Sequence, residues 1–259
     1  GDNRVLLWDT ATGERVRTIE TPSHRVAALA FCNPGNHVAV GSTSDEALLY
    51  DAAAGELVHR FPGHSATVRM AVSGDGRILA TASGEQVIQF WSLPSRRLIN
   101  RIEGDRRPFA AIALNPTGTL LATGGFDHYV RVRRVPDGKM LHAIHVAGKY
   151  DPRLAFSPNG RWLATGTLSG DVHLWEVKTW DLVRTFRGHV RYVRAIAFNH
   201  DSTRMATGGR DNSVRLWDVA TGEQVLRLDR HTDVTSAVAF APGDKYLFTG
   251  SRDGTGVLW

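Results

Sequence analysis

The chain has 259 residues, of which 42% are apolar and 22% are charged, so it can bury a sizeable core. Its formal net charge is +5, carried by 27 Arg and 4 Lys against 26 acidic residues, and no run of 18 apolar residues encodes a membrane span. The single cysteine, Cys32 in the apolar run Ala30–Cys32, excludes a disulfide within the chain and favours a reducing compartment. We therefore expect a cytoplasmic protein without membrane contact, and we interpret Cys32 as a buried structural thiol.

The chain begins with a short strand that ends in a Trp-Asp pair. Residues 4–8 predict this strand, 11–14 predict a turn, and Arg15–Glu20 predict a second strand. The position of that Trp then recurs at intervals of 42, 41, 42, 42, 42 and 42 residues, and five of the seven positions are Trp. The recurring positions are Trp8, Tyr50, Trp91, Arg133, Trp175, Trp217 and Trp259. A period of roughly 40–45 residues closed by Trp-Asp is the repeat signature of a four-stranded β-propeller blade.

The best-preserved repeat predicts four short strands. Apolar or alternating runs cover 192–198, 204–207, 213–218 and 224–228. They are separated by the turn-forming stretches 199–202, 208–212 and 220–223, which are rich in Asn, Asp, Ser and Gly. Equivalent turns recur along the chain, for example at 115–118 and 157–160. Because turn chemistry fixes the register of antiparallel strands, each repeat predicts one antiparallel meander.

The repeats divide the chain into one propeller domain over 1–259. The expected blades are 1–20 (partial), 21–61, 62–102, 103–144, 145–186, 187–228 and 229–259 (partial). The first begins on a third strand and the last stops on one, at Trp259. Two interpretations stay open: a fragment of a propeller with seven or more blades, or a ring of six. In the ring, Arg15–Glu20 would pair with Val257–Trp259 and leave Val5–Trp8 surplus.

These features resemble the WD-repeat β-propeller family over the whole chain, and in particular long bacterial multi-repeat WD proteins. In that family a His, a Ser or Thr, an Asp and a Trp brace each blade, since a buried imidazole and a buried indole N–H both need partners. The resemblance implies three such sets: His64, Thr81, Glu85 and Trp91; His189, Thr207, Asp211 and Trp217; and His231, Thr249, Asp253 and Trp259.

Three repeats depart from that pattern. The repeat ending at Arg133 keeps Thr123 and Asp127 but has Arg in place of Trp. The repeat ending at Trp175 keeps Thr165 but lacks the His, and the one ending at Tyr50 has Val40 at the Ser or Thr position. We expect these blades to be less rigid.

The resemblance also implies a partner-binding face, formed by residues after the Gly-His pair and before the turn Asp. On this chain those positions are rich in Arg and aromatic side chains, which are frequent in binding hot spots. The candidate partner-binding residues are Arg25, Arg106, Arg107, Phe126, Lys149, Tyr150, Arg191, Tyr192, Arg210 and Arg252. A basic face with aromatic rings suits acidic or phosphorylated peptides.

The sequence contains no catalytic, cofactor-binding or metal-binding constellation. His189, Thr207 and Asp211 could suggest a triad, but the same set recurs at blade spacing, as a structural brace does and a catalytic site does not. We expect a non-enzymatic scaffold or adaptor for protein–protein interaction, within a larger signalling or assembly protein. Two alternatives stay open: binding of nucleic acid or a phosphorylated ligand by the same basic face, and an enzyme with a site in the central channel.

Overall fold

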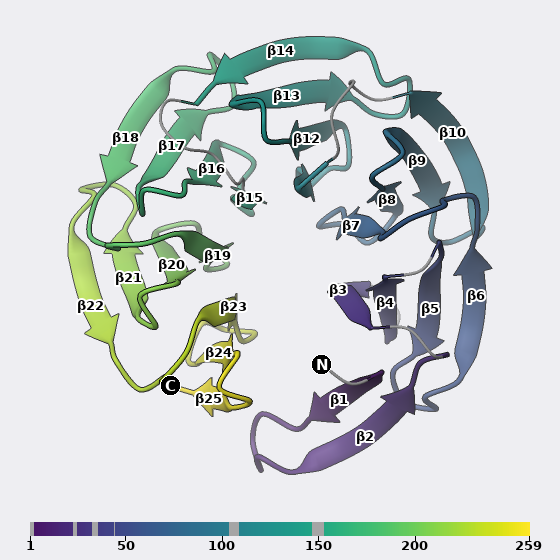
Figure 1. Ribbon diagram of the computed structural model, residues 1–259, viewed down its shortest axis with the longest axis horizontal. Coiled ribbons are helices and arrows are strands. Elements are labelled where there is room, and N and C mark those ends of the chain that lie inside the picture. Colours follow the sequence, from purple (N-terminus) through teal and green to yellow (C-terminus); the bar gives the residue numbers. More distant parts are fainter. Residues whose placement is uncertain (1–2, 23–24, 33–35, 44, 104–108, 147–152) are drawn as a thin grey trace. The chain divides into compact units, whose positions relative to one another are not determined.

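The computed structural model describes residues 3–22, 25–32, 36–43, 45–103, 109–146 and 153–259 (Figure 1). These residues form 25 strands and no helix, so the all-β prediction is confirmed. The described residues accordingly contain no helix that could cross a bilayer. Residue contacts divide the chain into two compact units, Gly1–Leu121 with Arg133–Met140, and Ala122–Val132 with Leu141–Trp259.

The first unit contains antiparallel sheets whose strands pair in chain order, as Figure 1 shows for β3 to β6. Their strands are β1 (Arg4–Trp8), β2 (Arg15–Glu20), β3 (Val26–Cys32), β4 (His37–Ser42), β5 (Ala47–Asp51), β6 (Leu57–Phe61), β7 (Arg69–Val72), β8 (Ile78–Ala82), β9 (Val87–Ser92) and β10 (Arg97–Glu103). β1 pairs with β2 from Arg4 opposite Glu20 to Trp8 opposite Arg15. The strand that the six-blade interpretation would leave surplus is therefore the partner of β2.

The second unit contains two complete sheets of the same kind and a three-stranded one. Their strands are β15 (Arg153–Phe156), β16 (Trp162–Gly166), β17 (Val172–Glu176), β18 (Leu182–Phe186), β19 (Val193–Phe198), β20 (Arg204–Gly209), β21 (Val214–Asp218), β22 (Gln224–Leu228), β23 (Thr235–Phe240), β24 (Leu247–Ser251) and β25 (Gly256–Leu258). The division between the units falls within a sheet of β11 (Ala111–Leu114), β12 (Leu120–Gly124), β13 (Tyr129–Arg134) and β14 (Met140–His145). The predicted four-stranded antiparallel repeat is therefore confirmed.

The turn between the third and fourth strands explains the Asp of the Trp-Asp pair. This carboxylate accepts hydrogen bonds from backbone N–H groups in the turn, with Asp9 bonded to Ala11 at 2.7 Å and Asp218 to Thr221 at 2.8 Å, and Asp51, which follows Tyr50, does the same in a third sheet. The turn then places one residue in the left-handed region, which favours glycine. Four turns have glycine there: Gly13, Gly55, Gly138 and Gly222. Two turns instead have Arg96 at φ 57° and Trp180 at φ 63°.

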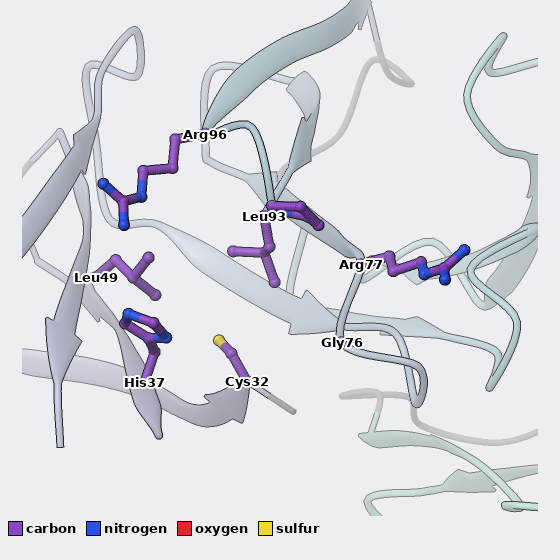
Figure 2. A pocket seen from close by; sticks show the side chains of 8 residues that line it. Cys32, His37, Leu49, Gly76, Arg77, Leu93 and Arg96 are labelled. Carbon is purple, nitrogen blue, oxygen red and sulfur yellow. The ribbon is translucent and has the colours of Figure 1, made fainter. Parts of the chain in front are cut away.

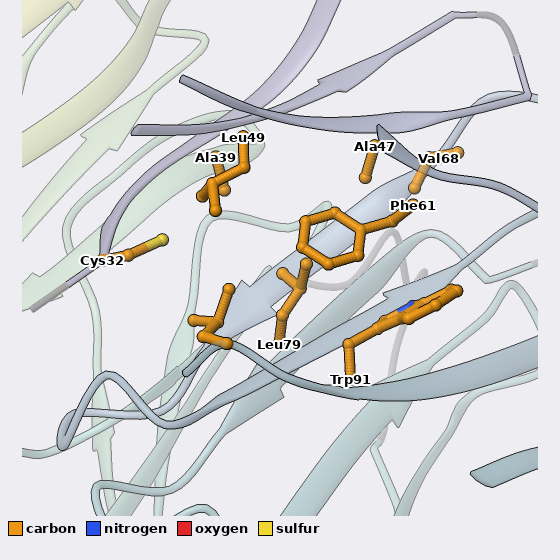
Figure 3. Packing of buried hydrophobic residues seen from close by; sticks show 9 residues of the cluster. Cys32, Ala39, Ala47, Leu49, Phe61, Val68, Leu79 and Trp91 are labelled. Carbon is orange, nitrogen blue, oxygen red and sulfur yellow. The ribbon is translucent and has the colours of Figure 1, made fainter. Parts of the chain in front are cut away.

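Apolar clusters between consecutive sheets explain the regular Trp. In the first unit, Phe61 at the end of β6 packs against Trp91 of β9, with ring centroids 5.2 Å apart (Figure 3). In the second unit, Phe186 of β18 packs against Trp217 of β21 at 5.6 Å. All four side chains are buried. Trp91 and Trp217 therefore contribute apolar area to the contact with the sheet before them, and burial of such area is the main favourable term in such repeats.

Polar contacts join the outer strand of one sheet to the turn of the next. Asn100 of β10 donates its Nδ2–H to the carbonyl of Pro136 at 2.9 Å, 36 residues later. Arg184 of β18 donates from both terminal nitrogens to the carbonyls of Thr221 and Ala220, each at 2.6 Å. We call these contacts the rim bonds.

Candidate functional site

A buried chain of hydrogen bonds crosses the β19–β22 sheet. Trp217 of β21 donates its Nε1–H to the Thr207 hydroxyl of β20 at 2.8 Å. That hydroxyl lies 2.8 Å from Nε2 of His189, whose Nδ1 lies 2.9 Å from Asp211 in the turn after β20. Because an ionised carboxylate only accepts, Nδ1–H donates to Asp211, and in the neutral imidazole Nε2 accepts the Thr207 hydroxyl proton. Every polar atom of this chain therefore has a partner.

The electrostatics of Asp211 keep the carboxylate ionised. Burial opposes ionisation, but hydrogen bonds from His189, Ser213 and the backbone N–H of Val190 outweigh it and hold the pKa of Asp211 far below its usual value. Ser213 donates at 2.9 Å and the Val190 N–H at 3.2 Å. The carboxylate therefore fixes the imidazole and the backbone that enters the first strand.

The same arrangement occurs in two further sheets. His231 lies 2.8 Å from Thr249 and 3.1 Å from Asp253, and Trp259 donates to Thr249 at 2.9 Å. A hydrogen bond from the Thr255 hydroxyl is the main cause that lowers the pKa of Asp253.

In the remaining set, His64 lies 2.9 Å from Thr81 and 3.0 Å from Glu85, and Trp91 donates to Thr81 at 3.1 Å. Burial lowers the pKa of His64, although Glu85 opposes this shift. A constellation that occurs three times with one geometry braces sheets and is not a unique reactive centre.

The sheets with incomplete sets keep part of this pattern. Trp175 still donates to Thr165 at 3.0 Å, and Asp127 pairs with Arg131 at 2.7 Å. Tyr50 is buried at the Trp position of its sheet and packs in an apolar cluster that includes Val40. Apolar packing therefore replaces the polar chain in that sheet.

Three of the predicted partner-binding residues come together in the second unit. Tyr192, Arg210 and Arg252 line one cavity of about 230 Å³, together with Arg194 and Val234. The Arg210 guanidinium lies 5.3 Å from the centre of the Tyr192 ring, within the range of a cation–π contact. The backbone N–H of Arg210 donates to the Tyr192 carbonyl at 2.8 Å, and that of Arg252 to the Val234 carbonyl at 3.0 Å. Arg210 and Arg252 thus hold the same place in consecutive sheets. We call this cavity the Arg–Tyr pocket.

Arg194 is a member of the pocket that the sequence did not indicate. The register between β19 and β20 shifts between Val193 and Ala195, so Arg194 lies at a β-bulge. A bulge redirects a side chain at the entrance of a strand. The alternation of the run 192–198 gives no sign of this bulge. The sequence shows that Arg194 is a basic residue close to Tyr192, but it does not show that Arg194 lines the pocket.

None of the other predicted partner-binding residues that the structure describes belongs to the lining of the Arg–Tyr pocket. Arg25 and Arg191 are exposed, and Phe126 is 58% exposed. Arg106, Arg107, Lys149 and Tyr150 lie outside the described residues. The described residues also contain no group of three or more His, Cys, Asp or Glu side chains that could hold a metal ion.

Comparison with known proteins places this architecture in a family. The sequence matches the family "WD domain, G-beta repeat" at residues 55–92, 96–133, 153–176, 180–218 and 222–259, which together cover more than half of the chain. The protein belongs to the WD-repeat β-propeller family. WD repeats generally mediate protein–protein interaction or scaffolding, and propellers of this family are typically not catalytic.

Two curated relatives carry similar repeats. The chain is 25% identical over 118 residues to the guanine nucleotide-binding protein subunit beta of Schizosaccharomyces pombe, covering 44% of this chain and 37% of that protein. It is 22% identical over 119 residues to the guanine nucleotide-binding protein G(I)/G(S)/G(T) subunit beta-1 of Homarus americanus, covering 44% and 35%. The match thus spans little more than a third of the length of these relatives.

Proposed function

We propose that the chain is a non-catalytic scaffold that binds a protein partner through the Arg–Tyr pocket and the exposed Arg191 beside it. The observation that carries this proposal is the shared cavity of Tyr192, Arg194, Arg210 and Arg252. None of the described residues that line the cavity is acidic. Guanidinium groups recognise carboxylate and phosphate through paired N–H donors. The partner is therefore an acidic or phosphorylated peptide segment.

The pocket geometry supports a peptide rather than a reaction. Tyr192 holds Arg210 by a ring contact, so less side-chain freedom is lost when Arg210 binds a ligand. Val234 adds a buried apolar wall. Aromatic and Arg side chains around a small apolar centre are characteristic of binding hot spots. We further propose that the chain works in the cytoplasm as part of a larger signalling or assembly protein, in line with the named relatives being subunits of larger assemblies.

Direct binding measurements test this function. The probes are a fluorescein-labelled peptide rich in Glu, the same peptide with a central phosphoserine, its Gln counterpart, and a single-stranded oligonucleotide of equal charge. We expect the two anionic peptides to bind and the Gln peptide to bind at least about tenfold more weakly. The double variant Arg210→Glu/Arg252→Glu should lose this binding.

The matched control reverses two exposed charges elsewhere in the same unit, Lys178→Glu/Arg187→Glu, and should keep peptide binding. If the pocket variant folds and binds as the unaltered protein does, the chosen site is wrong. Binding of the oligonucleotide alone, with a steep loss of affinity as salt rises, would instead favour the nucleic-acid alternative.

A further inference from the structure

A second cavity lies in the first unit, at the end of the sheets opposite to the braced loops. It measures about 380 Å³, at the lower end of the range for small-molecule sites. It lies beside the last residue of β3, the first residue of β4 and the turn between β9 and β10. The lining includes Cys32, His37, Leu49, Arg77, Leu93 and Arg96. It goes beyond the proposed function, which uses other residues in the other unit.

The side chains give this cavity an apolar floor and one cationic wall. In Figure 2 the Cys32 sulfur, the His37 ring, Leu49 and Leu93 point toward one another, and the Arg96 guanidinium extends over Leu49. Arg77 contributes to the lining, but its guanidinium points away from the other side chains (Figure 2). Cys32, Leu49 and Leu93 are buried, and burial raises the pKa of the Cys32 thiol to about 11, so the floor is uncharged at neutral pH.

Arg96 occupies this wall despite an unfavourable backbone conformation. It has φ 57° at the turn position where four other sheets have glycine. In this region a side chain other than Gly, Asn or Asp carries an energetic cost. Within the described residues, the Arg96 guanidinium has no hydrogen-bond or ion-pair partner that offsets this cost. Backbone strain of this kind concentrates at functional sites.

The acid closest in register to His37 is already engaged. Asp51 lies opposite His37 in the β4–β5 pairing, but its carboxylate accepts the backbone N–H groups of Ala53 and Ala54 at 2.8 and 2.7 Å. These bonds and the nearby His37 and Arg17 lower the pKa of Asp51. Asp51 therefore holds its own turn in place.

We propose that this cavity binds an aliphatic carboxylate. The hydrocarbon part lies on Leu49, Leu93 and the Cys32 side chain, and the carboxylate accepts paired N–H donors from Arg96. A single planar guanidinium matches a carboxylate in both charge and geometry. Such a ligand is either a free aliphatic acid or the C-terminal carboxylate of a peptide that ends in an aliphatic residue.

Calorimetric titration with small probes tests the site. Hexanoate should bind, whereas hexanol, which keeps the hydrocarbon, and acetate, which keeps the charge, should each bind at least about tenfold more weakly. Bound hexanoate should also slow alkylation of Cys32, which is the only thiol in the chain and so gives an unambiguous signal. Comparing hexanoate with N-acetyl-leucine separates the two sources, because the tighter ligand identifies a free acid or a peptide C-terminus.

Two variants decide whether Arg96 is responsible. Arg96→Gly removes the guanidinium and relieves the strained turn, so its melting temperature should equal or exceed that of the unaltered protein while hexanoate affinity falls at least about tenfold. Arg97→Ala, which removes the charge of an exposed neighbour that does not line the cavity, should keep hexanoate affinity. The proposal is overturned if hexanoate fails to bind the unaltered protein, if hexanol binds equally well, or if Arg96→Gly retains the affinity.

Discussion

Replacing Thr207 with Val removes one hydroxyl from the middle of the β19–β22 sheet and changes the shape of the side chain little. Thr207 is fully buried, and its hydroxyl is the common partner of Trp217 and His189. The substitution therefore leaves two buried polar atoms without partners, the Trp217 N–H and the His189 Nε2. Each orphaned group costs about 1–3 kcal/mol, so we expect the free energy of unfolding to fall by about 3 kcal/mol.

Urea unfolding followed by circular dichroism measures this loss. With a slope of about 1–3 kcal/mol per molar urea, the midpoint should fall by about 1–3 M. Thr203→Val is the matched control, because Thr203 is exposed and its hydroxyl bonds only within its own turn, donating to Asp201 and accepting a long bond of 3.4 Å from Asn199, so its cost should stay under about 1 kcal/mol.

A double-mutant cycle with Trp217→Phe isolates the shared bond. Removing the indole N–H makes one of the two orphaned groups disappear, so the double variant should be more stable than the sum of the single losses implies, by about 1 kcal/mol. A Thr207→Val loss below about 1 kcal/mol, or strict additivity with Trp217→Phe, would refute the buried chain of hydrogen bonds.

Two further predictions concern charged groups of the second unit. The pKa of Asp211 is lowered in the folded state, so ionised Asp211 contributes its full stabilisation above the unfolded-state pKa of about 4, and this stabilisation is lost as the pH falls below that value. In measurements of the free energy of unfolding against pH, Asp211→Asn should therefore be less stable than the unaltered protein at pH 7 but should lose less stability on acidification. Arg184→Ala removes both rim bonds to the following turn, which should cost about 1–2 kcal/mol and raise hydrogen exchange in the turn at 220–222, whereas Arg187→Ala, an exposed neighbour, should change neither.

Much of the fold could be predicted from the sequence because its determinants are local. Turn residues such as Gly13 and Gly222, and the Asp of each Trp-Asp pair, specify strand ends within a few residues, and the structure has strands between them. The resemblance to the WD-repeat family indicated the residues of the buried chain of hydrogen bonds. The recurrence at 42 residues also places Arg210 and Arg252 at equivalent points of consecutive sheets.

The cavities could not be predicted in the same way, because they depend on neighbouring sheets and on backbone irregularities. Arg194 reaches its place through a β-bulge that leaves the apolar alternation nearly intact. Arg96 looks like one more charged residue near an outer strand until its positive φ and its place in the lining of the cavity that also contains Cys32 and Leu49 are known. Neither feature has a local sequence signal.

The rim bonds also bear on how such an array can change in length. Each bond connects a donor on the outer strand to a carbonyl 36 or 37 residues later, a span shorter than the 42-residue repeat. A duplicated repeat therefore brings along a donor for the sheet that follows and an acceptor turn for the sheet that precedes. An internal repeat can therefore be gained or lost without new residues being needed to form the rim bonds. The rim bonds between sheets are inherited together with the duplicated segment.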